Sequence, residues 1–102
     1  MIFVYITCSD EEEARKIAWV LVEEKLAACV NILPSMTSIY EWEGRIEEES
    51  EFVLIAKTEI SKFSELEEKV KALHSYDVPC ICALNVAQVS QEFEGWVESQ
   101  LE

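Results

Sequence analysis

Residues 27–58 limit the folds open to this 102-residue chain more than any other stretch. They contain two long runs with a period of two, joined by Glu43-Gly44: one face of the first run carries Ser38, Tyr40 and Trp42, and one face of the second carries Ile46, Phe52, Leu54 and Ala56. Such alternation is typical of strands, and a glycine supplies the positive φ that a tight connection needs. We therefore predict a long β-hairpin with Gly44 in a type I turn closed by a bulge. Pro34-Ser35 interrupts the first run and predicts a bulge or kink, because proline cannot donate to the ladder.

The second arm of this hairpin, residues 45–58, is long for a chain of this size. When extended it spans roughly 43 Å at ~3.3 Å per residue. A compact domain of this chain length has a diameter of only about 33 Å. We therefore expect the ribbon to extend past its own domain and to pair with further copies of the chain. The alternative is a strongly twisted or bent hairpin that stays on one domain.

The segment before the hairpin predicts a strand followed by a helix. Residues 2–7 form a mostly apolar run that suits a central strand. The run from Ser9 to Glu12 matches a capping box, in which the Ser hydroxyl and the Glu carboxylate bind free amides at a helix start. Apolar residues at helical spacing follow, and we expect this helix to end near Lys25-Leu26.

The segment after the hairpin predicts a second helix, a fourth strand and a short terminal helix. Thr58 or Ser61 is the expected cap of the second helix, which should end near His74. Residues 78–86 are apolar enough for a strand, and Ser90 is the expected cap of the last helix.

This element order is β-α-β-β-α-β followed by a small helix. Right-handed crossovers place both main helices on one face of a four-stranded antiparallel sheet. The predicted class is therefore α+β, as one ferredoxin-like sandwich domain over residues 1–102 with a long β-hairpin and a short C-terminal helix. This fold hosts unrelated functions, so it decides little about activity.

The charge balance excludes several partners. Eight basic residues stand against 21 acidic ones, which gives a net charge of −13. Such a chain repels phosphate backbones and anionic membrane surfaces, so we expect neither nucleic acid nor membrane as a partner. No apolar run reaches the ~18 residues of a membrane span, and the N-terminal residues lack the features of a signal peptide. We expect a cytoplasmic protein with reduced cysteines.

The polar side chains leave several alternatives open. His74 either binds the last carbonyls of the second helix or ligates a metal. Cys80 and Cys82 lie two apart on a strand and share a face, so they either hold a soft ion together or are small core residues. Cys8 follows a strand near a helix N-terminus, where a thiolate is favoured if the residue is exposed, so it is the cysteine expected to be most reactive.

No motif indicates catalysis. Cys29 and His74 both lie at element ends and could meet as a dyad, but nothing in the sequence orients them and no oxyanion hole is evident. The copper-chaperone Cys-x-x-Cys, the RNA-recognition motif and the acylphosphatase loop are all absent. We therefore predict that the chain is not an enzyme.

Several stretches together resemble the CutA family of divalent-cation tolerance proteins. They cover nearly the whole chain in the family's order and spacing. The matching stretches are Leu26-Ala27-Ala28-Cys29-Val30-Asn31, Ser38-Ile39-Tyr40-Glu41-Trp42-Glu43-Gly44, Glu51, Lys57-Thr58, His74-Ser75-Tyr76-Asp77-Val78-Pro79 and Trp96.

The resemblance implies a homotrimer in which the long hairpins pair between subunits, and a link to tolerance of copper and other divalent cations. No obligatory cofactor is implied, although copper or another divalent cation is the expected ligand. A PII-like regulatory or scaffold trimer, which binds a small molecule or a protein between subunits, is the alternative. The residues that the resemblance places in the inter-subunit cleft are Cys29, Trp42, Glu51, Lys57, His74 and Tyr76, and the candidate metal ligands are His74, Cys29 and Cys80.

Three positions depart from the family pattern. Ser75 stands where proline is usual, and Phe93 replaces a tyrosine, so any role of that hydroxyl is absent. Cys80 stands in place of a glutamate, which removes a carboxylate from the polar cleft and adds a soft ligand.

Overall fold

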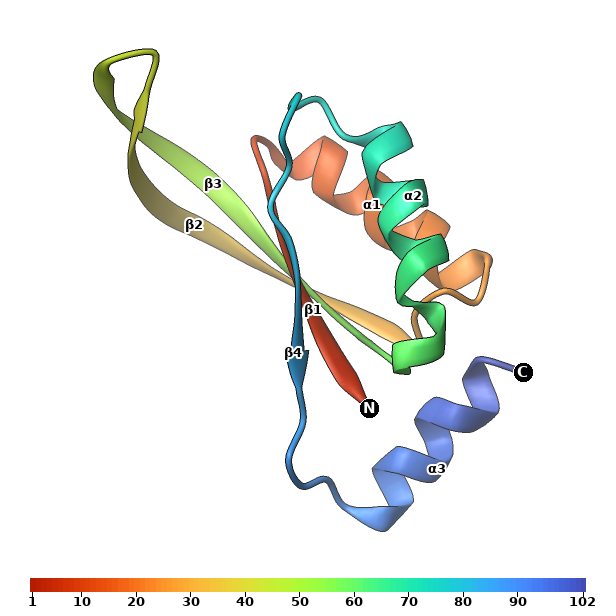
Figure 1. Ribbon diagram of the computed structural model, residues 1–102. Coiled ribbons are helices and arrows are strands. Elements are labelled where there is room, and N and C mark those ends of the chain that lie inside the picture. Colours follow the sequence, from red (N-terminus) through yellow and green to blue (C-terminus); the bar gives the residue numbers. More distant parts are fainter.

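The computed structural model describes all 102 residues and has the element order expected from the sequence. Helices α1 and α2 pack against one side of a sheet, while the β2–β3 hairpin projects past them (Figure 1). The predicted α+β, ferredoxin-like arrangement with a C-terminal helix is confirmed. The elements are β1 (Ile2–Cys8), α1 (Glu11–Glu23), β2 (Cys29–Trp42), β3 (Arg45–Thr58), the 3-10 turn η1 (Ile60–Lys62), α2 (Phe63–Leu73), β4 (Ile81–Asn85) and α3 (Gln91–Gln100).

The sheet has four antiparallel strands in the order β2-β3-β1-β4. Strand β1 is central, and its alternate residues Ile2, Val4 and Ile6 are buried beneath the helices. Helix α1 contributes Ile17 and Leu21 to the same core. A smaller cluster under α3 joins Ala28, Val97 and Leu101. No helix is long and apolar enough to cross a membrane.

The hairpin turn differs from the prediction. Trp42 pairs directly with Arg45, so only two residues form the connection. Glu43 has φ 51° and Gly44 has φ 79°. Positive φ at both central positions defines a type I′ turn, whose twist matches that of the flanking strands. The predicted type I turn with a bulge is therefore wrong, because Glu43 also adopts the left-handed conformation.

The bulge predicted at Pro34-Ser35 is confirmed. The β2–β3 register shifts between Leu33 and Met36, and Ser35 has φ 61°. Pro34 and Ser35 have no partners in the ladder, so no inter-strand hydrogen bond is lost because proline lacks an amide hydrogen.

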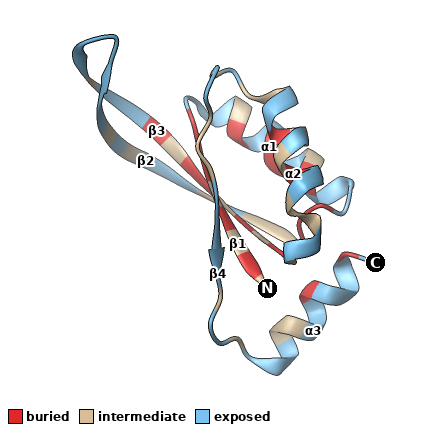
Figure 2. Cartoon of the chain, viewed as in Figure 1, coloured by how far each residue is buried: buried red, intermediate tan, exposed pale blue.

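The outer part of the hairpin extends away from the domain. None of residues 36–50 is buried, whereas the root of β3 is buried beneath the helices (Figure 2). The longest dimension of the protomer is 45 Å against 26 and 21 Å for the others. The alternative of a twisted or bent hairpin that stays on one domain is therefore wrong, because residues 36–50 have no buried side chain.

Helix α1 begins and ends differently from the expectation. The N-cap is Asp10 and not Ser9, because the Asp10 carboxylate accepts a 2.8 Å hydrogen bond from the Glu13 amide. The helix ends at Glu23, two residues before the predicted position. Lys25 takes φ 58°, and the Leu26 amide donates to the Leu21 carbonyl at 2.9 Å. This is a Schellman ending that has lysine where glycine is usual.

Neither expected cap of α2 is used. Ser61 lies within η1, and the Thr58 hydroxyl instead donates to the Leu26 carbonyl at 2.7 Å in the core. The end of α2 next to His74 is as predicted. Strand β4 is shorter than the predicted 78–86, because the chain before Ile81 is a loop and not part of the ladder. Ser90 caps α3 as expected, accepting from the Phe93 amide at 3.3 Å.

Candidate functional site

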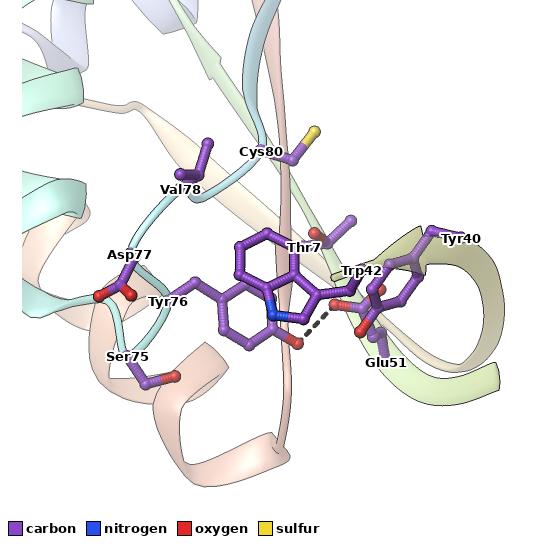
Figure 3. Close-up of a pocket in the computed structure, with 9 residues that line it drawn as sticks. All are labelled: Thr7, Tyr40, Trp42, Glu51, Ser75, Tyr76, Asp77, Val78 and Cys80. Atoms are coloured by element: carbon purple, nitrogen blue, oxygen red, sulfur yellow. Dashed lines mark hydrogen bonds between the residues drawn. The ribbon is translucent and has the colours of Figure 1, made fainter. Parts of the chain in front are cut away.

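A pocket of about 510 Å³ lies where the hairpin, the end of β1 and the α2–β4 loop meet (Figure 3). The hairpin supplies two aromatic rings and a carboxylate, and the α2–β4 loop supplies most of the remainder. The lining residues are Thr7, Tyr40, Trp42, Glu51, Ser75, Tyr76, Asp77, Val78 and Cys80.

A buried carboxylate is the polar centre of this pocket. Glu51 is only 6% exposed, although it lies on a strand that carries other, exposed glutamates. Its Oε2 accepts a 2.8 Å hydrogen bond from the Tyr76 hydroxyl. Burial, and then this bond to Glu51, raise the pKa of the Tyr76 phenol, so it remains a donor at neutral pH.

Trp42 and Tyr40 of the hairpin line the same pocket as Glu51 and Tyr76 (Figure 3). Both hairpin aromatics are substantially exposed to solvent. Glu51, itself buried, therefore lines the pocket together with these two aromatic rings and its hydrogen-bond donor Tyr76. Three residues that the sequence assigned to one cleft, Trp42, Glu51 and Tyr76, are thus brought together.

His74 lies directly behind the pocket, with its side chain completely buried. Its Nε2 lies 2.7 Å from the Thr7 carbonyl, and its Nδ1 accepts a 3.1 Å hydrogen bond from the Tyr76 amide. The imidazole therefore does not bind the last carbonyls of α2, which was one of the two expectations. It fastens the α2–β4 loop to the end of β1 and so fixes the position of Tyr76.

Cys8 and Glu13 lie next to His74, and the sequence did not suggest this grouping. One ligand atom from each residue lies within 4.8 Å of the others. Glu13 belongs to the first turn of α1, where an acidic residue looks like an ordinary partner of the helix dipole. Only the packing of the end of α2 against β1 brings it to an imidazole, and no spacing along the chain signals that contact.

Cys8 is not the reactive cysteine that its place near a helix N-terminus suggested. It is fully buried. Burial, and then the Glu13 carboxylate, raise the pKa of its thiol to about 12. The protonated thiol therefore predominates at neutral pH, and the expected activation by the helix terminus is overridden.

Cys80 and Cys82 do share a face, as predicted, with their sulfur atoms 3.8 Å apart. Cys82 is exposed and Cys80 is half-buried at the pocket wall, so the alternative of two core residues is wrong. Burial, and then the contact with Cys82, raise the pKa of the Cys80 thiol.

Cys29 and Lys57 lie at the opposite end of the sheet. They form a cross-strand pair, and Lys57 also pairs with Phe3. The Lys57 ammonium lies 5.8 Å from the Phe3 ring centre and 5.7 Å from that of Phe93. Thr7, which lines the pocket, pairs with Val53, four residues before Lys57 on β3. The pocket is therefore about 13 Å from Lys57.

The six cleft residues therefore form two groups within one protomer: Cys29 with Lys57, and Trp42, Glu51 and Tyr76 with His74 behind them. The predicted ligands His74, Cys29 and Cys80 do not converge in one protomer either, since only Cys8, Glu13 and His74 form such a cluster. A site that includes all six residues requires a second subunit.

Comparison with known proteins identifies relatives along the whole chain. The family model of the CutA1 divalent ion tolerance protein matches residues 2–100. The divalent-cation tolerance protein CutA of Archaeoglobus fulgidus is 49% identical over 98% of this chain and 97% of its own. The corresponding protein of Thermus thermophilus is 52% identical over 92% of this chain and 91% of its own.

Solved structures agree with this match. The A. fulgidus structure, described as a periplasmic divalent cation tolerance protein, superposes with a TM-score of 0.96 at 48% identity and covers 100% of both chains. CutA from Xylella fastidiosa gives a TM-score of 0.96 at 35% identity, covering 99% of this chain and 97% of its own.

Proposed function

The chain belongs to the CutA1 divalent ion tolerance protein family, and we propose that it is a homotrimeric tolerance protein that binds copper or other heavy divalent cations. The observation that carries this proposal is the division of the cleft residues into two groups at opposite ends of one sheet. A symmetric assembly can bring the Cys29–Lys57 end of one protomer to the Trp42–Glu51–Tyr76 end of the next. Binding without catalysis is the expected activity.

The unpaired strand edges and exposed apolar side chains of the hairpin support the proposed assembly. Strand β2 is at the edge of the sheet, and β3 pairs with β1 only from Phe52 onward. Residues 45–51 of β3 therefore have no neighbour on that side. Ile39 and Ile46 are 68% and 71% exposed. Open strand edges and exposed apolar side chains are both features that a partner strand would cover.

Charge and ligand chemistry support cation binding. A net charge of −13 per chain attracts cations to the protein surface. Thiols and imidazole are the ligands that copper and zinc prefer. All four cysteines are free, which favours a reducing compartment, and we propose the cytoplasm.

One observation favours a second candidate, a PII-like regulatory or scaffold trimer. The pocket of about 510 Å³ lies within the range of small-molecule sites. It combines aromatic walls with one buried hydrogen-bonding pair, as such sites often do. A small polar molecule or a segment of a partner protein would fit this chemistry.

The first experiment measures the mass of the assembly and its affinity for Cu²⁺. Sedimentation equilibrium should give three times the 11.7 kDa chain mass. Calorimetric titration should show Cu²⁺ binding that weakens at least tenfold in His74→Ala. A monomer in solution would count against the proposed trimer, and equal Cu²⁺ affinity in both proteins would remove His74 as a ligand.

A thermal-shift screen separates the two candidates. Nucleotides and small metabolites should leave the melting temperature of a dedicated metal-binding protein unchanged, whereas a pocket ligand would raise it by linkage. Tyr76→Phe removes the donor to Glu51 and tests whether any such shift arises in the pocket.

A further inference from the structure

In the cluster of Cys8, Glu13 and His74, the hydrogen-bond partners of the imidazole decide which of its nitrogens carries the proton. The Thr7 carbonyl only accepts hydrogen bonds, so His74 Nε2, at 2.7 Å from it, carries a proton. The Tyr76 amide only donates, so His74 Nδ1, at 3.1 Å from it, carries a lone pair. The imidazole is therefore neutral, with its tautomer fixed by two backbone groups.

In this tautomer, His74 Nδ1 and the Glu13 carboxylate face each other although both are hydrogen-bond acceptors. Glu13 Oε1 lies 3.5 Å from His74 Nδ1, which is the distance of an ion pair, yet Nδ1 has no proton to share. Glu13 Oε1 is also buried and has no hydrogen-bond partner. A buried carboxylate oxygen without a partner destabilises the protein unless a positive group lies nearby.

We propose that Cys8, Glu13 and His74 form an internal binding site for a divalent transition-metal ion of the zinc type, enclosed by β1, α1 and the end of α2. This inference rests on the proposed metal-binding function and assigns to it a specific set of ligands. It differs from the set expected from the sequence, because Cys8 and Glu13 replace Cys29 and Cys80.

The donor set fits such an ion. One thiolate, one imidazole and one carboxylate are common zinc ligands, at about 2.3, 2.0 and 2.1 Å from the metal. Ligating imidazoles usually donate their second N–H to a carbonyl or carboxylate, and the Thr7 carbonyl already accepts it here. A fourth position remains for water or another ligand.

Binding requires three local changes. The metal replaces the Cys8 thiol proton, which is released to solvent, and it takes the Nδ1 lone pair from the Tyr76 amide. Ligand atoms up to 4.8 Å apart must also approach to the roughly 3.5 Å spacing of a tetrahedral site. Glu13 can make most of this movement, since its side chain reaches in from the first turn of α1.

The Tyr76 amide links this site to the pocket. Tyr76 bonds His74 through its amide and Glu51 through its phenol. Thr7 similarly accepts from His74 and lines the pocket. Occupancy of the metal site therefore changes the position of the pocket wall.

The test uses Co²⁺ as a spectroscopic probe of the metal-free, reduced protein. We expect one Co²⁺ per chain, with a sulfur-to-cobalt charge-transfer band and the intense visible bands of tetrahedral cobalt. Cys8→Ser should abolish the charge-transfer band. Glu13→Gln keeps the side-chain shape but removes its charge, and should weaken Co²⁺ and Zn²⁺ binding at least tenfold. Cys82→Ser, which removes an exposed thiol, is the matched control and should retain both properties.

The possible results separate the site from the function. If the band survives in Cys8→Ser but is lost in Cys29→Ser or Cys80→Ser, the protein binds metal and the proposed ligand set is wrong. If the wild type binds neither Co²⁺, Zn²⁺ nor Cu²⁺, both proposals fail. Should Cys8→Ser not fold, as judged by circular dichroism, unchanged affinity in Glu13→Gln would by itself overturn the site.

Discussion

The inner and outer halves of the β2–β3 hairpin are made from the same two strands, yet their surroundings differ completely. The inner half, residues 29–33 and 52–58, lies beneath the helices, and Leu54 is 0% exposed. The outer half, residues 36–50, has no buried residue, and Ile46 is 71% exposed. The bulge at Pro34-Ser35 lies at the boundary between them.

The difference shows that alternation along a strand indicates two faces but not what covers them. In the inner half the covering layer is α1 and α2 of the same chain. In the outer half, exposed apolar residues such as Ile39 and Ile46 have no covering layer from the same chain. Glu51 lies at the transition and is buried by the pocket residues instead. The inner half therefore stabilises the protomer, while the apolar residues of the outer half fit the proposed assembly.

The largest expected effect comes from truncating one residue in each half. Leu54→Ala removes a fully buried side chain and should lower the free energy of unfolding by about 2–5 kcal/mol. Urea denaturation should show this loss at every protein concentration. Ile46→Ala is the control, and its effect should depend on protein concentration if the proposed assembly covers this side chain. Equal, concentration-independent losses would remove the distinction between the halves.

Shortening the outer half tests it directly. Removing Thr37 and Ser38 together with their partners Ser50 and Glu49 deletes two residue pairs and preserves the alternation of faces. The proposed trimer should then dissociate at least tenfold more readily, which is about 1.4 kcal/mol. The single substitution Trp42→Ala should act in the same direction. Sedimentation measures both effects, and a shortened variant that remains a stable trimer would show that the ribbon does not join the subunits.

The smallest expected effect concerns the turn at the tip. Gly44 has φ 79° and no atom within 4 Å of an added Cβ, so Gly44→Ala adds only backbone strain and should destabilise by about 1 kcal/mol. Gly95 also has open space around it but lies inside α3. Gly95→Ala should stabilise by roughly 0.5–1 kcal/mol. Thermal unfolding of both variants compares the signs, and a stabilising Gly44→Ala would contradict the type I′ turn.

Local chemistry allowed most of the fold to be predicted. Period-two alternation with one glycine located the hairpin, and Pro34 located its bulge. The turn type was missed because Glu43 gives no signal for positive φ. The α1 cap was missed by one residue, because Ser9 and Asp10 are both competent caps and the sequence does not decide between them.

The candidate site was predicted less completely, for reasons of tertiary packing. Trp42, Glu51 and Tyr76 were expected together through the family resemblance, and the pocket contains them. Glu13 was not expected, because an acidic residue in the first turn of a helix already has a sufficient local explanation. Cys8 was placed correctly at a strand end, but its burial depends on helices that lie far along the chain.

The charges on the outer half of β3 affect how readily a newly synthesised chain aggregates. Glu47, Glu48 and Glu49 follow one another along it, so carboxylates project from both faces of a ribbon whose edges are open. Charge of this kind discourages the strand-to-strand aggregation that an uncharged ribbon would undergo. Folding of one chain and the proposed assembly of several chains can therefore be separate steps.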